Sequence, residues 1–211
     1  MDSKHKPARQ DSRSEATRQA IVEAAESLFA QEGIDAVSLR RIGAQIGAGN
    51  TAVVAYHFGD KASLITAILH HRLPEFEARR AQLLAGLDAD TADLLAVLRA
   101  LWLPVFEQRD ARGKHSYAAF LASLGRSQWG WLWSGAEPIV PVTLQLGRML
   151  EARVPEAARP LFSERTMACT ALITTMLDTL DRDEGVSARR EQALFEDALR
   201  MAAAALAAPG E

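Results

Sequence analysis

The sequence predicts an all-α protein in two parts, a small N-terminal group of helices followed by a larger helical domain. Three observations carry this prediction. Alanine, leucine, glutamate and arginine dominate the chain, the alternation of valine, isoleucine and threonine typical of strands is absent, and glycine and proline fall at intervals that divide it into helix-length segments. With 211 residues, of which 48% are hydrophobic and 24% charged, the chain is long enough to bury a core.

The N-terminal end is polar up to the first helix. Residues 1–13 are expected to form a disordered basic arm, and the first helix is expected from Ser14 to Gln31. One apolar stripe runs along this helix, formed by Ala20, Ile21, Ala24, Ala25, Leu28 and Phe29. Gly33 follows where a glycine commonly ends a helix in the left-handed conformation.

Two short helices are expected next. The first covers residues 38–46, with Ser38 as its N-cap, and Gly47 and Gly49 interrupt it. The second covers residues 50–57, with Asn50 as its N-cap. Gly59 closes this helix, and Asp60 caps a fourth helix that continues to about Arg80.

Two short helices joined by a glycine-bearing turn, after a longer packing helix, form a helix-turn-helix. Asn50 and Thr51 can hydrogen-bond to bases or phosphates, the alanines of the second short helix permit close approach to a major groove, and Lys61 can reach a phosphate. The candidate DNA contacts are Ser38, Arg40, Arg41, Asn50, Thr51, Ala52, Ala55, Tyr56, His57 and Lys61. The competing interpretation is that the helix pair serves packing alone, with His57 in the core.

The charge balance neither supports nor excludes a nucleic-acid partner. The net charge is −3, and residues 1–61 hold eight basic and eight acidic side chains. Any DNA-binding face must therefore come from the arrangement of charges and not from their sum.

The segments "TRQAIVEAAESLFAQEGIDAVSLRRIGAQIGAG" and "YHFGDKASLITAIL" resemble the N-terminal domain of TetR-type transcriptional regulators over about residues 14–70. The resemblance implies a homodimeric repressor that binds double-stranded DNA. A small effector would release it from the DNA by changing the separation of the two DNA-reading helices. It divides the chain into a DNA-binding domain, residues 14–60, and a regulatory and dimerisation domain, residues 61–211. The chain departs from the common pattern in a turn one residue longer, "GAGN", and in Ala55, where many members place a phosphate-binding tyrosine.

The second part carries no motif, and helices are expected over 91–108, 114–126, 137–153, 163–182 and 187–207. Aromatic side chains recur in it, and the simpler interpretation is that they form the core. The functional interpretation is a pocket for a small apolar or aromatic effector. Its candidate lining residues are Trp102, Phe106, His115, Tyr117, Phe120, Leu124, Met149 and Met176.

The last two helices carry apolar stripes suited to a four-helix bundle across a two-fold axis. The candidate interface residues are Leu172, Met176, Leu180, Leu194, Leu199 and Met201. Packing within one chain explains the same stripes, and the family resemblance favours the dimer.

An enzyme is not expected, nor is a cofactor or metal. His70 and His71 precede Glu75, but adjacent histidines on a helix point about 100° apart and cannot share a metal ion. The single cysteine, Cys169, is expected to be a buried apolar residue, and it agrees with a reducing cytoplasm. No membrane contact is expected. Two alternatives stay open: a regulator whose C-terminal domain only dimerises, and a helical protein-interaction module that does not bind DNA.

Overall fold

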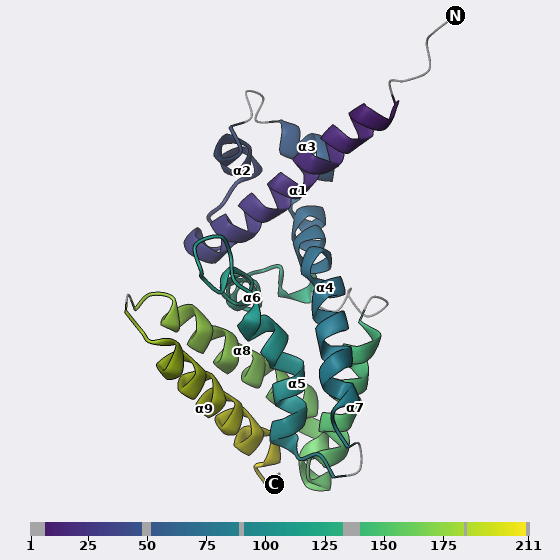
Figure 1. Cartoon of the computed structure of the whole chain (residues 1–211), viewed down its shortest axis with the longest axis vertical. Helices are drawn as coiled ribbons and strands as arrows, with labels where there is room; N and C mark the ends of the chain where they lie inside the picture. The colour runs from purple at the N-terminus through teal and green to yellow at the C-terminus, as the bar shows by residue number, and fades with distance from the viewer. Residues whose placement is uncertain (1–6, 48–51, 89–90, 133–139, 184, 210–211) are drawn as a thin grey trace, which may run out of the picture.

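A computed structural model of the chain describes residues 7–47, 52–88, 91–132, 140–183 and 185–209. Over these residues the backbone is helical and contains no β-strand, which confirms the predicted all-α class. Figure 1 shows a small group of helices near the N-terminus, a long helix leading away from it and a larger bundle at the other end. Within the described ranges, no helix is long and apolar enough to cross a bilayer.

The N-terminal group consists of α1 (Pro7–Glu32), α2 (Leu39–Gln45), α3 (Val53–Phe58) and the beginning of α4 (Lys61–Ala85). The first helix begins earlier than predicted, so that residues 7–13 of the expected arm are helical. Residues 12–16 are all exposed. Residues 12–16 carry no apolar stripe, which is why the periodicity does not reveal this part of the helix.

The larger bundle contains α5 (Leu94–Glu107), α6 (Ser116–Arg126), α7 (Pro141–Arg153), α8 (Phe162–Leu180) and α9 (Ala188–Ala207). Each helix lies within a few residues of its predicted range. A short 3-10 helix, η2 (Glu156–Leu161), lies between the two helices predicted over 137–153 and 163–182. The last two helices, α8 and α9, pack against each other along their length (Figure 1).

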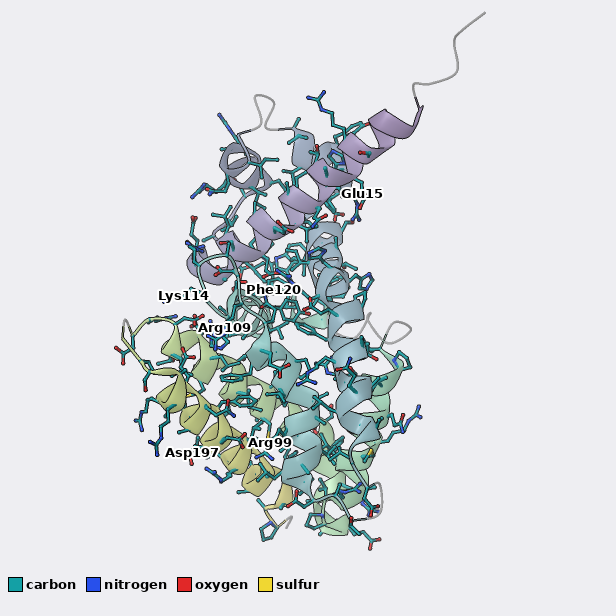
Figure 2. The ribbon with its side chains drawn as sticks, in the orientation of Figure 1. Glu15, Arg99, Arg109, Lys114, Phe120 and Asp197 are labelled. Atoms are coloured by element: carbon teal, nitrogen blue, oxygen red, sulfur yellow. The ribbon has the colours of Figure 1, made fainter. Side chains whose placement is uncertain are left out.

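The helix α6 connects the two parts of the molecule. It packs against α1 on one side and α8 on the other, and every residue from Ser116 to Leu124 is buried. A helix that is buried all round belongs to the centre of a protein. Phe120 of α6 lies in the interior, where its ring is 6.3 Å from the ring of Phe29 in α1 (Figure 2).

The long helix α4 belongs to both parts. Its early residues Leu64, Ile65 and Ile68 are fully buried and pack with the N-terminal group, whereas its later turns contact α5 and α7. One partly buried and one buried polar residue, Glu77 and Arg80, fix that later part. The Glu77 carboxylate accepts a hydrogen bond from the backbone N–H of Val142 at 2.8 Å, and Arg80 Nε donates to the Leu101 carbonyl at 3.0 Å. The predicted domain boundary between residues 60 and 61 thus falls at the start of a helix shared by both parts.

Candidate nucleic-acid interface

The short helix α3 turns one side inward and the other to solvent. Val54 and Phe58, four residues apart, are buried, and they join the core of the N-terminal group. On the opposite side Ala52 and Ala55 are exposed, and 85% of the Tyr56 surface is accessible to solvent. A helix that is held from behind and presents small residues with one aromatic residue has the shape that a major groove admits.

The beginning of this helix differs from the prediction. The helix starts at Val53, not at residue 50, and the N-cap position is occupied by Ala52, which offers no side-chain acceptor. Asn50, the expected cap, and Thr51 lie outside the described residues. Gly47 ends the preceding segment with a φ of +66°, a backbone conformation that favours glycine.

The helix α2 has the predicted N-cap. The Ser38 hydroxyl accepts a hydrogen bond from the backbone N–H of Arg41 at 3.1 Å. The Arg41 guanidinium forms an ion pair with Glu32 at 2.9 Å and donates to Gln45 at 3.0 Å, so its position on the surface is fixed. Arg40 is exposed on the same helix. Two cations therefore lie in the first turn of α2.

The start of α4 contains the predicted Asp60 cap. Asp60 accepts a hydrogen bond from the backbone N–H of Ser63 at 2.8 Å, and this bond lowers the pKa of the Asp60 carboxyl. The position of Lys61 differs from the one expected for a phosphate contact. Its ammonium donates to the Ile34 carbonyl at 2.5 Å, and burial lowers the pKa of Lys61. In this conformation Lys61 joins α4 to the loop before α2.

One contact beside α3 is absent from the predicted set. The Arg18 guanidinium of α1 lies 4.7 Å from the centre of the Phe58 ring, within the range of a cation–π interaction. Arg18 is exposed and extends the basic surface next to the end of α3. The remaining predicted contact, His57, is partly buried, with its ring edge-to-face against Tyr56 at 5.2 Å.

The eight residues predicted to line an effector pocket lie in the core. Trp102, Phe106, His115, Tyr117, Phe120 and Leu124 are buried, and Met149 and Met176 are partly buried. The Phe106 ring stacks on Phe195 with centroids 4.3 Å apart, and it lies 5.5 Å from the His115 ring. The His115 ring nitrogen Nδ1 is 2.8 Å from Asp181.

The six residues predicted for the dimer interface divide into two sets. Leu180 and Leu199 are buried within this chain, which leaves them no surface for a partner. Leu172, Met176 and Leu194 are partly buried against the core, and Met201 is 41% exposed. Met167 of α8, which is not in the predicted set, is 69% exposed.

The described residues contain no group of three or more His, Cys, Asp or Glu side chains that could hold a metal ion.

Residues 21–68 match the family described as bacterial regulatory proteins, tetR family. The matched segment begins within α1, includes α2 and α3, and ends at Ile68 of α4. No curated protein matches the chain.

Proposed function

We propose that the chain is a DNA-binding transcriptional regulator of the tetR type, a repressor that binds a pseudo-palindromic operator as a homodimer. The observation that carries this proposal is the outward side of α3, where Tyr56 is 85% exposed beside the exposed residues Ala52 and Ala55 within the matched segment. An exposed tyrosine of this kind has no role in the core of the N-terminal group. It is available for a phosphate or a base edge.

Around α3, the charged residues favour contact with the DNA backbone. Arg40, Arg41 and Arg18 are exposed close to the two short helices, although the net charge of the chain is negative. Two such surfaces related by a two-fold axis would occupy successive major grooves about 34–36 Å apart. We propose Ser38, Asn50, Thr51, Ala52, Ala55 and His57 as further contacts, with Lys61 as the residue that positions the start of α4.

DNA fragments that flank the gene of this protein provide the test. The substitutions Tyr56→Ala and Arg40→Ala should each weaken binding by about 1–3 kcal/mol. Arg40→Ala should also reduce the steepness of the plot of log K against log salt concentration by about 1. Fluorescence anisotropy at several salt concentrations measures both quantities. Arg148→Ala, an exposed arginine on α7, is the matched control. Unchanged affinity and salt slope in both α3-side variants would contradict the assignment of the interface.

For the dimer we propose the outer surface of α8 and α9. Met167 and Met201 are exposed there, and the alanines Ala168, Ala171, Ala204 and Ala205 leave room for close approach of a second copy. Met167→Asp and Met201→Asp together should convert the dimer to a monomer in analytical ultracentrifugation. Leu144→Asp, an exposed leucine on α7, should not. A monomeric original protein, or a double variant that stays dimeric, would rule out this surface.

The effector would release the protein from DNA by favouring a conformer in which the two α3 helices no longer match the operator. A regulator whose C-terminal domain only dimerises is the second candidate. The close stacking of Phe106 on Phe195 favours it, because side chains in contact leave little room for an effector among the predicted pocket residues. A small molecule that lowers the affinity of the protein for its operator would favour the effector-responsive repressor over the regulator that only dimerises.

A further inference from the structure

The outward side of α3 is made of two small side chains and one aromatic side chain. Ala52 and Tyr56 lie four residues apart and share this side, and the backbone N–H of Tyr56 donates to the Ala52 carbonyl at 2.9 Å. Ala55 is exposed beside them, whereas Val54 and Phe58 are buried on the opposite side. Among the three exposed side chains, the Tyr56 hydroxyl is the only hydrogen-bonding group. A partner of this side therefore meets two methyl groups and one phenol.

Each base presents a different feature in the major groove, and each feature suits different side chains. Arginine and lysine read guanine, asparagine and glutamine read adenine, and aspartate and glutamate read cytosine, whereas apolar side chains contact the C5 methyl group of thymine. Residues 52–58 include none of these charged or amide residue types. The thymine methyl group is therefore the base feature that the two alanines on the outward side of α3 can contact.

His57 does not act as a base-reading residue in this arrangement. It is partly buried, and its ring lies edge to face with the Tyr56 ring, with the centroids 5.2 Å apart and the planes at 85°. Such a contact between rings is favourable and restricts the orientation of the Tyr56 ring. His57 thus supports the tyrosine, and Ala52 and Ala55 remain the small side chains of the outward side.

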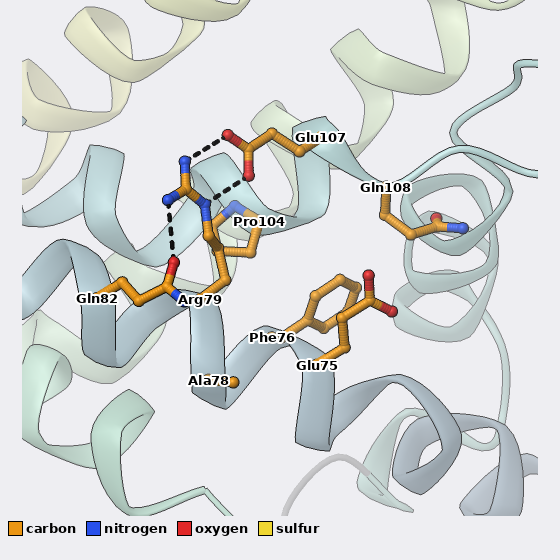
Figure 3. A pocket seen from close by; sticks show the side chains of 8 residues that line it. All are labelled: Glu75, Phe76, Ala78, Arg79, Gln82, Pro104, Glu107 and Gln108. Carbon is orange, nitrogen blue, oxygen red and sulfur yellow. Dashed lines mark hydrogen bonds and ion pairs between the residues drawn. The ribbon is translucent and has the colours of Figure 1, made fainter.

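The cations near α3 supply affinity without sequence information. Arg40 of α2 and Arg18 of α1 are exposed, and neither forms an ion pair with another of the described residues. By contrast, in the cleft between α4 and α5, both carboxylate oxygens of Glu107 accept hydrogen bonds from the Arg79 guanidinium at 2.8 Å (Figure 3). Unpaired arginines are available for phosphates, and phosphate contacts position a protein on DNA without reading its sequence. Among the described residues, sequence selection therefore falls to α3.

We propose that α3 selects its operator through the methyl groups of thymine, with Ala52 and Ala55 as the residues that contact them. An alanine side chain that packs against a thymine methyl group removes apolar surface of both from water. A cytosine at the same place has no methyl group, and its amino group would be left without a partner. This inference rests on the proposed function, because it concerns the DNA that the same surface binds.

The test uses the full chain and a DNA fragment, from those that flank its gene, in which footprinting has located the two half-sites. Deoxyuridine replaces every thymidine of both half-sites, which removes the methyl groups and leaves base pairing unchanged. The original protein should bind the substituted fragment more weakly by about tenfold or more, as measured by fluorescence anisotropy. The same replacement between the half-sites is the control, and it should leave the affinity unchanged.

Variants of the protein assign this loss to the alanines. For the double variant Ala52→Gly with Ala55→Gly, the affinities for the two fragments should differ by less than about twofold. Their ratio does not depend on the fraction of protein that is folded, so a weakened helix does not obscure the result. Ala20→Gly, at an exposed position of α1, is the matched control and should keep the full ratio. Arg40→Ala should weaken binding to both fragments equally.

Three results would overturn the proposal. They are equal affinity of the original protein for both fragments, half-sites that contain no thymine, and an affinity ratio that survives the double glycine variant. In each of these cases the protein still binds DNA, and the effects of Tyr56→Ala and Arg40→Ala still test the proposed function separately. If the protein binds none of the flanking fragments, the proposed function fails and this inference fails with it.

Discussion

Lys61 and Cys169 show how burial alters the chemistry of a single side chain. The Lys61 ammonium, which the sequence suggests as a phosphate contact, instead donates to a backbone carbonyl in the loop before α2. That partner is 27 residues away in the chain, and neither helical periodicity nor a motif predicts it. Loss of solvent lowers the pKa of Lys61, since water stabilises the ammonium more than the neutral amine.

Cys169 should react slowly in the folded protein. It is 3% exposed, and burial raises the pKa of its thiol, which reduces the fraction of the reactive thiolate at any given pH. At pH 8 we therefore expect the reaction with a chromogenic aromatic disulfide to be at least tenfold slower than in urea. Its rate should still be rising at pH values where an exposed thiol has levelled off. The chain has one cysteine, so the signal belongs to Cys169 alone. Equal rates in the folded and unfolded states would contradict the burial.

At the scale of an element, the junction between α3 and α4 depends on Gly59. Its φ and ψ are 75° and −71°, and the backbone N–H of Asp60 donates to the Phe58 carbonyl at 2.9 Å. This geometry is a γ-turn with a positive φ, which is strained for any residue with a Cβ atom. No atom lies within 4 Å of a Cβ placed there, so the cost of a substitution comes from the backbone alone.

Gly59→Ala should accordingly lower the free energy of unfolding by about 1–2 kcal/mol. The matched control is Gly125→Ala, because Gly125 lies in α6, its Cβ would also meet nothing within 4 Å, and its φ is not positive. There alanine should be neutral or stabilise by up to about 1 kcal/mol. Urea unfolding of the three proteins measures both changes. If the two variants are equally stable, the turn does not require glycine.

The ends of the elements also show what the sequence could predict. Ser38, Gly59 and Asp60 act within three or four residues of their own position, so local patterns predict their roles. The start of α3 was predicted wrongly, because Asn50 is a good N-cap by type, whereas the helix begins at Val53. Among the site residues, the exposure of Tyr56 follows from the helical period. The burial of Leu199 depends on contacts between distant helices.

At the scale of the whole molecule, a buried charge cluster joins the two parts. Glu26 of α1 is 1% exposed, and its carboxylate accepts hydrogen bonds from Arg72 Nε of α4 at 3.0 Å and from the Ser116 hydroxyl of α6 at 2.5 Å. Nearby, the backbone N–H of Ile34 donates to the Ser123 hydroxyl of α6 at 3.0 Å. Three helices from both parts therefore meet at polar contacts that tolerate little displacement.

Removing one partner from this cluster should cost far more than removing a surface ion pair. Arg72→Met leaves the Glu26 carboxylate buried without its cation, and it should lower the free energy of unfolding by about 3–5 kcal/mol. Arg182→Met breaks the exposed pair with Asp178 and should cost no more than about 0.5 kcal/mol.

The double variant Glu26→Leu with Arg72→Met tests the cause of that loss. It should recover much of the stability lost in Arg72→Met, because no charge is then left buried. Urea unfolding monitored by circular dichroism gives the energies of Arg72→Met, of Glu26→Leu and of the double variant. A double variant as unstable as the sum of the two single variants would show that the cost lies in packing and not in the orphaned carboxylate. In that case polar contacts would not be what couples the N-terminal group of helices to the rest of the chain.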